Sequence, residues 1–194
     1  MIAGLILAGG RARRLGGGDK PLLRLGGTTM LERIAAAIAL PAIAISANGD
    51  PARFARFGFP VLSDGDFFDA GPLAGVLAGL EWAERLGAMA LLTVPGDTPF
   101  IPLGLAAVLT PAPACAASGG RRHHTIALWP VEARIALRAH LSRPGPRDVA
   151  GFAAAIGMRA ADFASGPRDP FLNVNTSDDL ETARNEIGAE GENA

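Results

Sequence analysis

The strongest constraint on the fold is the alternation of short apolar segments with segments of helical periodicity. Almost continuously apolar runs at 2–7, 42–47, 60–62 and 88–94 are bounded by Gly, Pro, Asn or Asp, as buried strands usually are. Strands without a polar face need cover on both sides of their sheet, which a parallel sheet flanked by helices supplies. The pattern therefore predicts an α/β fold with a doubly wound, mostly parallel sheet.

The helical segments complete this prediction. Thr29 and Glu32 have the spacing of a capping box at the start of a helix over 30–40, and Gly87 suits the end of a helix over 73–86. A short helix is expected after Pro51. Further strands are expected at 114–117 and 125–129, and further helices at 131–141, 149–156 and 177–187. We expect one domain over 1–187 and a loose tail over 188–194.

Composition and charge exclude several classes of protein. The 194 residues suit one domain, and 18 basic against 19 acidic side chains give a net charge of −1, so the basic field of a nucleic-acid binder is missing. The longest apolar run, 34–45, is broken by Pro41 and is too short to span a membrane. The N-terminus lacks the order of a secretory signal, and Cys115 lies in an apolar stretch that suits packing. These features predict a cytoplasmic protein without nucleic-acid or membrane partners.

A loop rich in glycine and cations follows the first strand. Residues 7–20 contain five glycines and four basic side chains. Glycine lets backbone amides approach phosphate oxygens, and Arg and Lys neutralise phosphate charge. Ligands of doubly wound sheets bind where the strands end, so a phosphate site is favoured over a solvated surface loop.

Two standard phosphate motifs do not match this loop. A Walker A motif ends in Gly-Lys-Ser/Thr, whereas Lys20 is followed by Pro21. A dinucleotide fingerprint runs directly into a helix, whereas this loop carries four cations and then Pro21. Neither a P-loop NTPase nor a Rossmann dehydrogenase is therefore favoured.

The loop and four later motifs resemble the molybdenum cofactor guanylyltransferase family, within the nucleotidyltransferase superfamily. They occur in the family's order and cover nearly the whole chain. The motifs are Leu-Ala-Gly-Gly-x-x-x-Arg-Leu-Gly-Gly-x-Asp-Lys at 7–20, Gly-Pro-Leu-Ala-Gly at 71–75, Pro-Gly-Asp-Thr-Pro at 95–99, His-Thr-Ile-Ala-Leu-Trp at 124–129, and Phe-Leu-Asn-Val-Asn-Thr at 171–176.

The resemblance implies a Mg²⁺-dependent enzyme that transfers GMP from GTP to the terminal phosphate of molybdopterin and releases pyrophosphate. It implies a Rossmann-like fold with GTP bound by the N-terminal half and molybdopterin by the C-terminal half. By the same resemblance, Arg14 and Lys20 bind the triphosphate and act in catalysis. The backbone of Leu7, Ala8 and Gly9 contacts the nucleotide.

Asp97 is the candidate metal ligand. It follows the apolar run 88–94 across Pro95 and Gly96, which places it where a strand ends. Magnesium takes one or two carboxylates together with phosphates and waters, and the family's metal ligand stands at this position. The alternative is an aspartate that only caps the turn before Pro99.

The base of GTP is expected to meet Asp64, Ser46 and Asn48. Guanine presents donors at N1 and N2, so a carboxylate there selects guanine, and Asp64 matches the family's base-reading position. The alternative is that Asp64, Asp66 and Asp69 all lie in a solvated acidic loop. The family often has Asn where this chain has Ser46, which leaves that contact open, and Asn48 before Gly49 is also a common turn pair.

The acceptor side is less clearly marked. Gly71 and Pro72 open a helix, and the resemblance gives this pair and the later Asn173 and Asn175 to the acceptor site. The two asparagines alternate with apolar residues, so both amides should point to one side. Trp129 either fills the core or packs under the acceptor, and the core is favoured.

Two other functions stay open. A related cytidylyltransferase would share the glycine loop and differ in the base pocket, while a non-catalytic nucleotide-binding module would bind without releasing pyrophosphate. Beyond its substrates GTP and molybdopterin, the enzyme is expected to be a monomer in transient contact with proteins that donate and accept the molybdenum cofactor.

Overall fold

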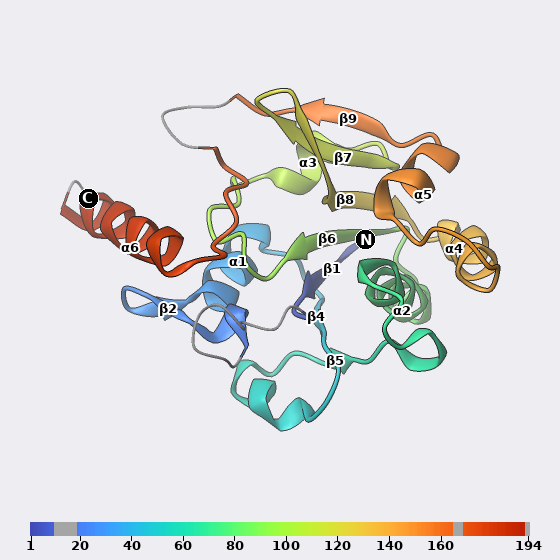
Figure 1. The fold of residues 1–194 in the computed structure, drawn as a ribbon, viewed down its shortest axis with the longest axis horizontal. Helices are drawn as coiled ribbons and strands as arrows, with labels where there is room; N and C mark the ends of the chain where they lie inside the picture. Colours follow the sequence, from blue (N-terminus) through green and yellow to red (C-terminus); the bar gives the residue numbers. More distant parts are fainter. Residues whose placement is uncertain (10–18, 165–168, 193–194) are drawn as a thin grey trace.

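The computed structural model describes residues 1–9, 19–164 and 169–192, and it contains a seven-stranded sheet with helices on both faces (Figure 1). The strand order is β5–β4–β1–β6–β8–β7–β9. All neighbouring strands run parallel except in the two pairs that β8 makes, with β6 and with β7. The doubly wound, mostly parallel sheet expected from the sequence is therefore confirmed.

The elements follow one another in the α/β order. The strands of the sheet are β1 (Ile2–Leu7), β4 (Ile43–Ser46), β5 (Val61–Leu62), β6 (Ala90–Pro95), β7 (Ala114–Ser118), β8 (Arg121–Pro130) and β9 (Arg159–Asp162). A separate hairpin consists of β2 (Arg24–Leu25) and β3 (Thr28–Thr29). The α-helices are α1 (Met30–Ile38), α2 (Pro72–Arg85), α3 (Leu105–Leu109), α4 (Ala133–Leu141), α5 (Val149–Ala155) and α6 (Ser177–Glu192), and the 3₁₀ turns are η1 (Lys20–Leu22), η2 (Pro51–Phe57) and η3 (Gly65–Phe67).

Two apolar clusters fill the space between the sheet and its helices. On one face α1 and α3 pack on the sheet through residues such as Ile34 and Leu105. On the other face α2, α4 and α5 do so, and Cys115 and Trp129 are both fully buried there, which confirms their packing roles. Gly79 lets α2 lie close to the sheet, because a Cβ there would stand 2.6 Å from a Leu5 methyl carbon.

Local signals in the sequence explain several boundaries. The capping box of α1 is confirmed, since Thr29 accepts from the Glu32 amide while the Glu32 carboxylate accepts from the Thr29 amide at 2.7 Å. The last helix continues to Glu192, so the loose tail expected over 188–194 is wrong at least to that residue. In the part of the chain that the structure describes, no helix is long and apolar enough to cross a membrane.

The register of the sheet brings four strand ends level. Leu7 at the end of β1 pairs with Ser46 of β4 and with Pro95 of β6, and Ser46 also pairs with Leu62 of β5. We call this side of the sheet the carboxyl edge. The residues that follow these strands, Gly9, Asn48, Asp64 and Asp97 among them, therefore leave the sheet at the same edge.

Candidate active site

Lys20 and Asp97 meet at the carboxyl edge, although 77 residues separate them. Lys20 lies in η1, and its Nζ is 3.3 Å from Oδ2 of Asp97 in the turn after β6. The same Nζ donates to Oδ1 of Asn175 at 2.5 Å. The side chains of Lys20 and Asp97 are 14% and 23% exposed, so both charges are partly screened from water yet reachable.

A close backbone approach holds these two turns together. A Cβ on Gly96 would stand 2.5 Å from Cγ of Pro21 and 3.3 Å from the carbonyl oxygen of Leu7. Gly96 also donates its N–H to that carbonyl at 2.9 Å. Glycine is therefore required beside Asp97 for η1, and with it Lys20, to reach the metal candidate.

The C-terminal segment 169–176 contacts the turn after β6 at the carboxyl edge. The N–H of Val174 donates to the carbonyl of Asp97 at 2.8 Å, and the Thr98 hydroxyl donates to Oδ1 of Asn173 at 2.7 Å. Val174 is fully buried in a third apolar cluster, with Leu25, Met30, Phe100 and Ala183. The amides of Asn173 and Asn175 instead bond to Thr98 and Lys20, in keeping with the expected alternation. The Asn173 amide oxygen thus holds the turn that carries Asp97, and the Asn175 amide oxygen holds the Lys20 side chain.

Asp179 fixes the end of this segment. Its Oδ2 accepts the N–H groups of Asn175 and Thr176 at 2.9 and 2.8 Å, and these bonds lower the pKa of the carboxyl. The carboxylate therefore stabilises the start of α6.

Asn48 and Asp64 form a reciprocal pair between the ends of β4 and β5. Asn48 Nδ2 donates to Asp64 Oδ2 at 2.6 Å, and the Asp64 N–H donates back to Asn48 Oδ1 at 3.0 Å. Asp66 and Asp69 are exposed, whereas Asp64 is half-buried. The three acidic residues are thus not equivalent, and Asp64 is the one held in a fixed orientation.

The remaining candidate residues for the nucleotide differ in burial and in the groups that they contact. Ser46 is buried, and its hydroxyl faces α2, where a Cβ on Gly75 would stand 2.3 Å from it. Ala8 donates its N–H to the carbonyl of Ser46 at 2.8 Å. Gly9 is exposed with open space beside its Cα. Arg14 lies outside the described residues.

Gly71 and Pro72 begin α2, which starts after the carboxyl end of β5. Gly71 is the residue before the helix with φ of +75°, a conformation that side chains other than glycine rarely adopt, and Pro72 is the first helical residue. Among the described residues, no hydrogen bond joins Gly71 or Pro72 to Asn173 or Asn175.

A second polar cluster, missed by the sequence reasoning, ties 169–176 to the β7–β8 hairpin. The Ser118 hydroxyl donates to Asp169 Oδ1 at 2.7 Å and lies 2.8 Å from His123 Nε2, while Phe171 donates its N–H to the same carboxylate. Since the single hydroxyl proton goes to Asp169, His123 is the donor to Ser118. Burial lowers the pKa of His123. The sequence carried no motif for this cluster.

A buried hydrogen-bonded chain shapes β8 next to the carboxyl edge. Trp129 Nε1 donates to the Thr93 hydroxyl at 2.9 Å, and this hydroxyl donates to the carbonyl of Thr125 at 2.8 Å. The β7–β8 register is irregular here, because Cys115 pairs with Ala127 but the next residue pairs with His123. The hydrogen-bonded chain therefore lies beside a bulge in the β7–β8 pairing.

The residues around Asp97 fit a magnesium ion whose ligands come partly from the protein and partly from a bound substrate. Within 1–9, 19–164 and 169–192, no three His, Cys, Asp or Glu side chains gather as a metal site. Magnesium binds through one or two carboxylates plus substrate phosphates and waters. Asp97 suits this arrangement, because a carboxylate has two oxygens and Lys20 contacts one of them.

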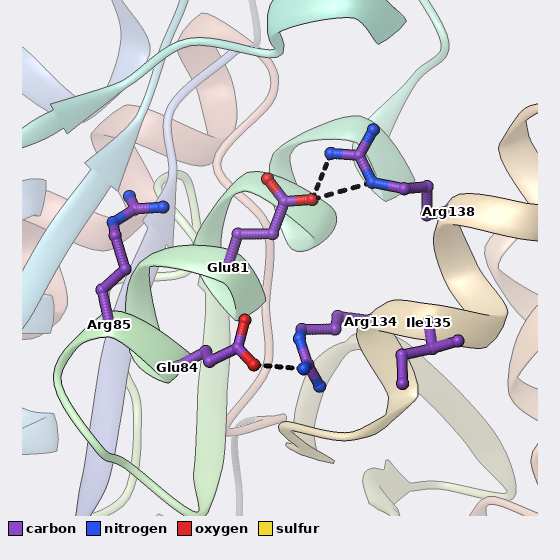
Figure 2. A pocket seen from close by; sticks show the side chains of 6 residues that line it. All are labelled: Glu81, Glu84, Arg85, Arg134, Ile135 and Arg138. Atoms are coloured by element: carbon purple, nitrogen blue, oxygen red, sulfur yellow. Dashed lines mark hydrogen bonds and ion pairs between the residues drawn. The ribbon is translucent and has the colours of Figure 1, made fainter.

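A pocket between α2 and α4 lies away from these residues. Glu81 pairs with Arg138 and Glu84 with Arg134 across it (Figure 2). The pocket lies between the end of α2 and the start of α4, at the edge of the sheet opposite the carboxyl edge. Its two carboxylates are already paired with arginines. It is a helix-packing feature and not part of the candidate active site.

Comparison with known proteins agrees with this geometry. The family model for the MobA-like NTP transferase domain matches residues 4–156. The chain belongs to this family. The MobA-like chain is 58% identical to a protein named molybdenum cofactor guanylyltransferase from Acidiphilium cryptum (strain JF-5), over 94% of this chain and 93% of that protein.

Solved structures share the fold at lower identity. Molybdopterin-guanine dinucleotide biosynthesis protein A from Archaeoglobus fulgidus has a TM-score of 0.73 and 17% identity to the MobA-like chain, covering 97% of this chain and 100% of that one. A protein named 4-diphosphocytidyl-2C-methyl-D-erythritolsynthase from Anaerococcus prevotii DSM 20548 has a TM-score of 0.72 and 12% identity, covering 97% and 96%. A protein whose name refers to a cytidyl compound thus has the same fold, so the fold alone does not show which nucleotide base a protein binds.

Proposed function

We propose that this protein transfers GMP from GTP to the terminal phosphate of molybdopterin, forming the guanine dinucleotide and releasing pyrophosphate. The observation that carries the proposal is the meeting of Lys20 with Asp97 at the carboxyl edge, in a chain closely related to a named molybdenum cofactor guanylyltransferase. A nucleotidyl transfer needs a cation for the triphosphate and a hard oxygen ligand for its metal at one place.

The reaction is a displacement at phosphorus. An oxygen of the acceptor's terminal phosphate attacks the α-phosphorus of GTP, a new P–O bond forms, and the bond to pyrophosphate breaks. Since the attacking oxygen is already anionic, the chief requirements are charge neutralisation and alignment. Two of the three Nζ protons of Lys20 are taken by Asp97 and Asn175, so the ammonium is aimed and its remaining N–H is available to a phosphate oxygen.

Magnesium would be held by Asp97 together with the triphosphate, where it neutralises charge on the phosphate oxygens. Asp97 itself is positioned by the backbone bond from Val174 to its carbonyl and by the Gly96 turn. Arg14 is proposed to bind the same triphosphate, as the resemblance implies.

The Asn48–Asp64 pair supports guanine over cytosine. Guanine N1–H and N2–H are donors that a carboxylate accepts, while cytosine N3 is an acceptor that a carboxylate repels. Asn48 holds one carboxylate oxygen of Asp64 at 2.6 Å and so sets the direction of the other. Leu7, Ala8, Gly9 and Ser46 remain proposed nucleotide contacts, and Gly71, Pro72, Asn173 and Asn175 remain proposed contacts of the acceptor.

The direct test is a reconstitution with purified protein, Mg²⁺, GTP and molybdopterin. We expect pyrophosphate and the guanine dinucleotide in equal amounts, and neither when Mg²⁺ is replaced by a chelator. Lys20→Ala should lower kcat/KM by about 10²-fold, as loss of one preorganised charged donor does. Arg85→Ala, which removes an exposed cation at the end of α2, serves as the control and should leave the rate unchanged.

Two other results would replace this proposal. Preferred turnover of CTP would make the protein a cytidylyltransferase, and nucleotide binding without pyrophosphate release would make it a binding module. The proposed monomer, cytoplasmic location and transient contacts with proteins that donate or accept the cofactor are tested separately, by light scattering, by cell fractionation and by crosslinking to those proteins.

A further inference from the structure

Arg53 joins two loops that the proposed reaction uses for different parts of GTP. It lies in η2, between the end of β4 and the start of β5, and no sequence motif marks it. Its Nη2 donates to the carbonyl of Asn48 at 2.6 Å, and its Nη1 donates to the carbonyl of Asp50 at 2.6 Å. The guanidinium thus holds the backbone of the loop whose Asn48 side chain orients Asp64.

The third nitrogen of the same guanidinium reaches the glycine loop. Arg53 Nε forms an ion pair at 2.8 Å with Oδ2 of Asp19, the residue directly before Lys20, without the geometry of a hydrogen bond. Asp19 stands where a capping residue of η1 would stand, yet its side chain makes no cap bond to that turn. Its carboxylate faces Arg53 instead, so this contact is one between loops and not a local feature of η1.

The arginine is itself fixed. Its guanidinium stacks 4.8 Å from the ring centre of Phe54, which is fully buried in the core. The Arg53 and Asp19 side chains are 26% and 23% exposed, so water screens the pair only in part. A planar guanidinium that donates to two carbonyls, pairs by charge with a carboxylate and lies over an aromatic ring has a geometry that lysine cannot reproduce.

We propose that Arg53 is a positioning residue that sets the separation between the base-reading pair Asn48–Asp64 and the triphosphate lysine Lys20. The inference rests on the proposed function, because it assigns the base to the first group and the phosphates to the second. Arg53 touches neither part of the nucleotide. It holds the base-reading pair and Lys20 at a fixed distance. Once the base is bound, the triphosphate therefore reaches Lys20 with little further cost in conformational entropy.

This role predicts a pattern of affinities that a merely structural residue would not give. Arg53→Gln should raise the Kd of GTP about 10-fold and lower the GTP-over-CTP preference, because the two halves no longer hold one spacing. Kd for inorganic pyrophosphate, which needs only the Lys20 side, should stay within about 2-fold. Arg53→Lys should recover little, since it keeps the charge near Asp19 but not the contacts to both carbonyls.

The control is Arg56→Gln. Arg56 lies on the same turn and stacks over Phe57 at 4.6 Å, as Arg53 does over Phe54, but it is exposed. It should change none of these constants. Asp19→Asn breaks the same contact from the other loop, so it should reproduce the loss, and the double variant with Arg53→Gln should be no worse than the more damaging single change.

Isothermal titration of GTP, CTP and pyrophosphate into each variant decides the matter, with thermal unfolding run alongside. Equal weakening of GTP and pyrophosphate would mean that Arg53 acts on the phosphates, and additive losses in the double variant would mean that the two loops are not coupled; either result overturns the inference. If Arg53→Gln does not fold, Asp19→Asn carries the test alone. Failure of the wild-type protein to bind GTP would instead refute the proposed function.

Discussion

Gly96→Ala is expected to separate Lys20, the proposed triphosphate lysine, from Asp97, the proposed metal ligand, without touching either. The added Cβ would stand 2.5 Å from Cγ of Pro21, where carbon atoms in contact lie about 3.5 Å apart. The proline ring is not a flexible side chain, so η1 must move by about 1 Å and take Lys20 with it. Displacements of this size lower catalytic rates by about 10²-fold.

The assay is kcat/KM for guanylyl transfer, with unfolding followed in parallel. We expect a fall of about 10²-fold, and overpacking of this kind costs about 1–3 kcal/mol, which is a loss of roughly 2–12 °C in Tm for a domain of this size. Gly27→Ala is the control, because no atom lies within 4 Å of the position of its Cβ. Adding Pro21→Ala to the first variant should restore part of the rate, since the next neighbour is then at 3.1 Å. A Gly96→Ala enzyme within 3-fold of wild type would refute the reasoning.

Three further predictions concern the metal, the base and pH. Asp97→Asn should abolish Mg²⁺-dependent turnover while GTP binding without metal stays measurable by titration, since an amide is a poorer ligand for a hard cation; retained turnover would leave Asp97 as a turn residue. Asp64→Asn should lower the GTP:CTP ratio of kcat/KM by 10-fold or more and Asp66→Asn should not, because only the first carboxylate is half-buried and paired. Burial lowers the pKa of His123, so below about pH 6.5 the unfolded chain binds a proton that the folded chain refuses, and Tm should fall from pH 7 to 5. His123→Asn should make that fall shallower; an unchanged slope would show that other groups set it. Although burial opposes it, hydrogen bonds from Phe171 and Ser118 lower the pKa of Asp169, so its contribution is lost only at still lower pH.

The strands and most helices could be predicted because burial on both sides leaves an apolar signature. The elements that were missed lack it. The edge strand β9 runs from Arg159 to Asp162 with only two alanines between, and it pairs with β7 on one side alone. The helix α3 is five residues long, and β2 and β3 have two residues each, too short for any period to be recognised.

The same difference divides the candidate site. Asp64 and Asp97 could be expected at one edge because each follows a strand, and parallel strands end on the same side. The contact of Lys20 with Asn175 could not, because 169–176 has no regular structure and its path depends on tertiary contacts such as Asp169 with Ser118. Arg53 escaped notice for a related reason: its hydrogen bonds go to two backbone carbonyls, which leave no trace in the side-chain sequence.

The bond between Lys20 and Asn175 joins residues 155 positions apart, and this separation has a consequence for synthesis. Ribosomes add about 5–20 residues per second, so roughly 8–30 s pass between the appearance of the lysine and that of its partner. During that time β1, β4 and β6 can already form the floor of the proposed nucleotide site, but the segment that aims the lysine does not yet exist. A nascent chain can therefore form the strands under the proposed nucleotide site well before it can catalyse the proposed transfer. A chain truncated before Asn175 would lack the partner that orients Lys20.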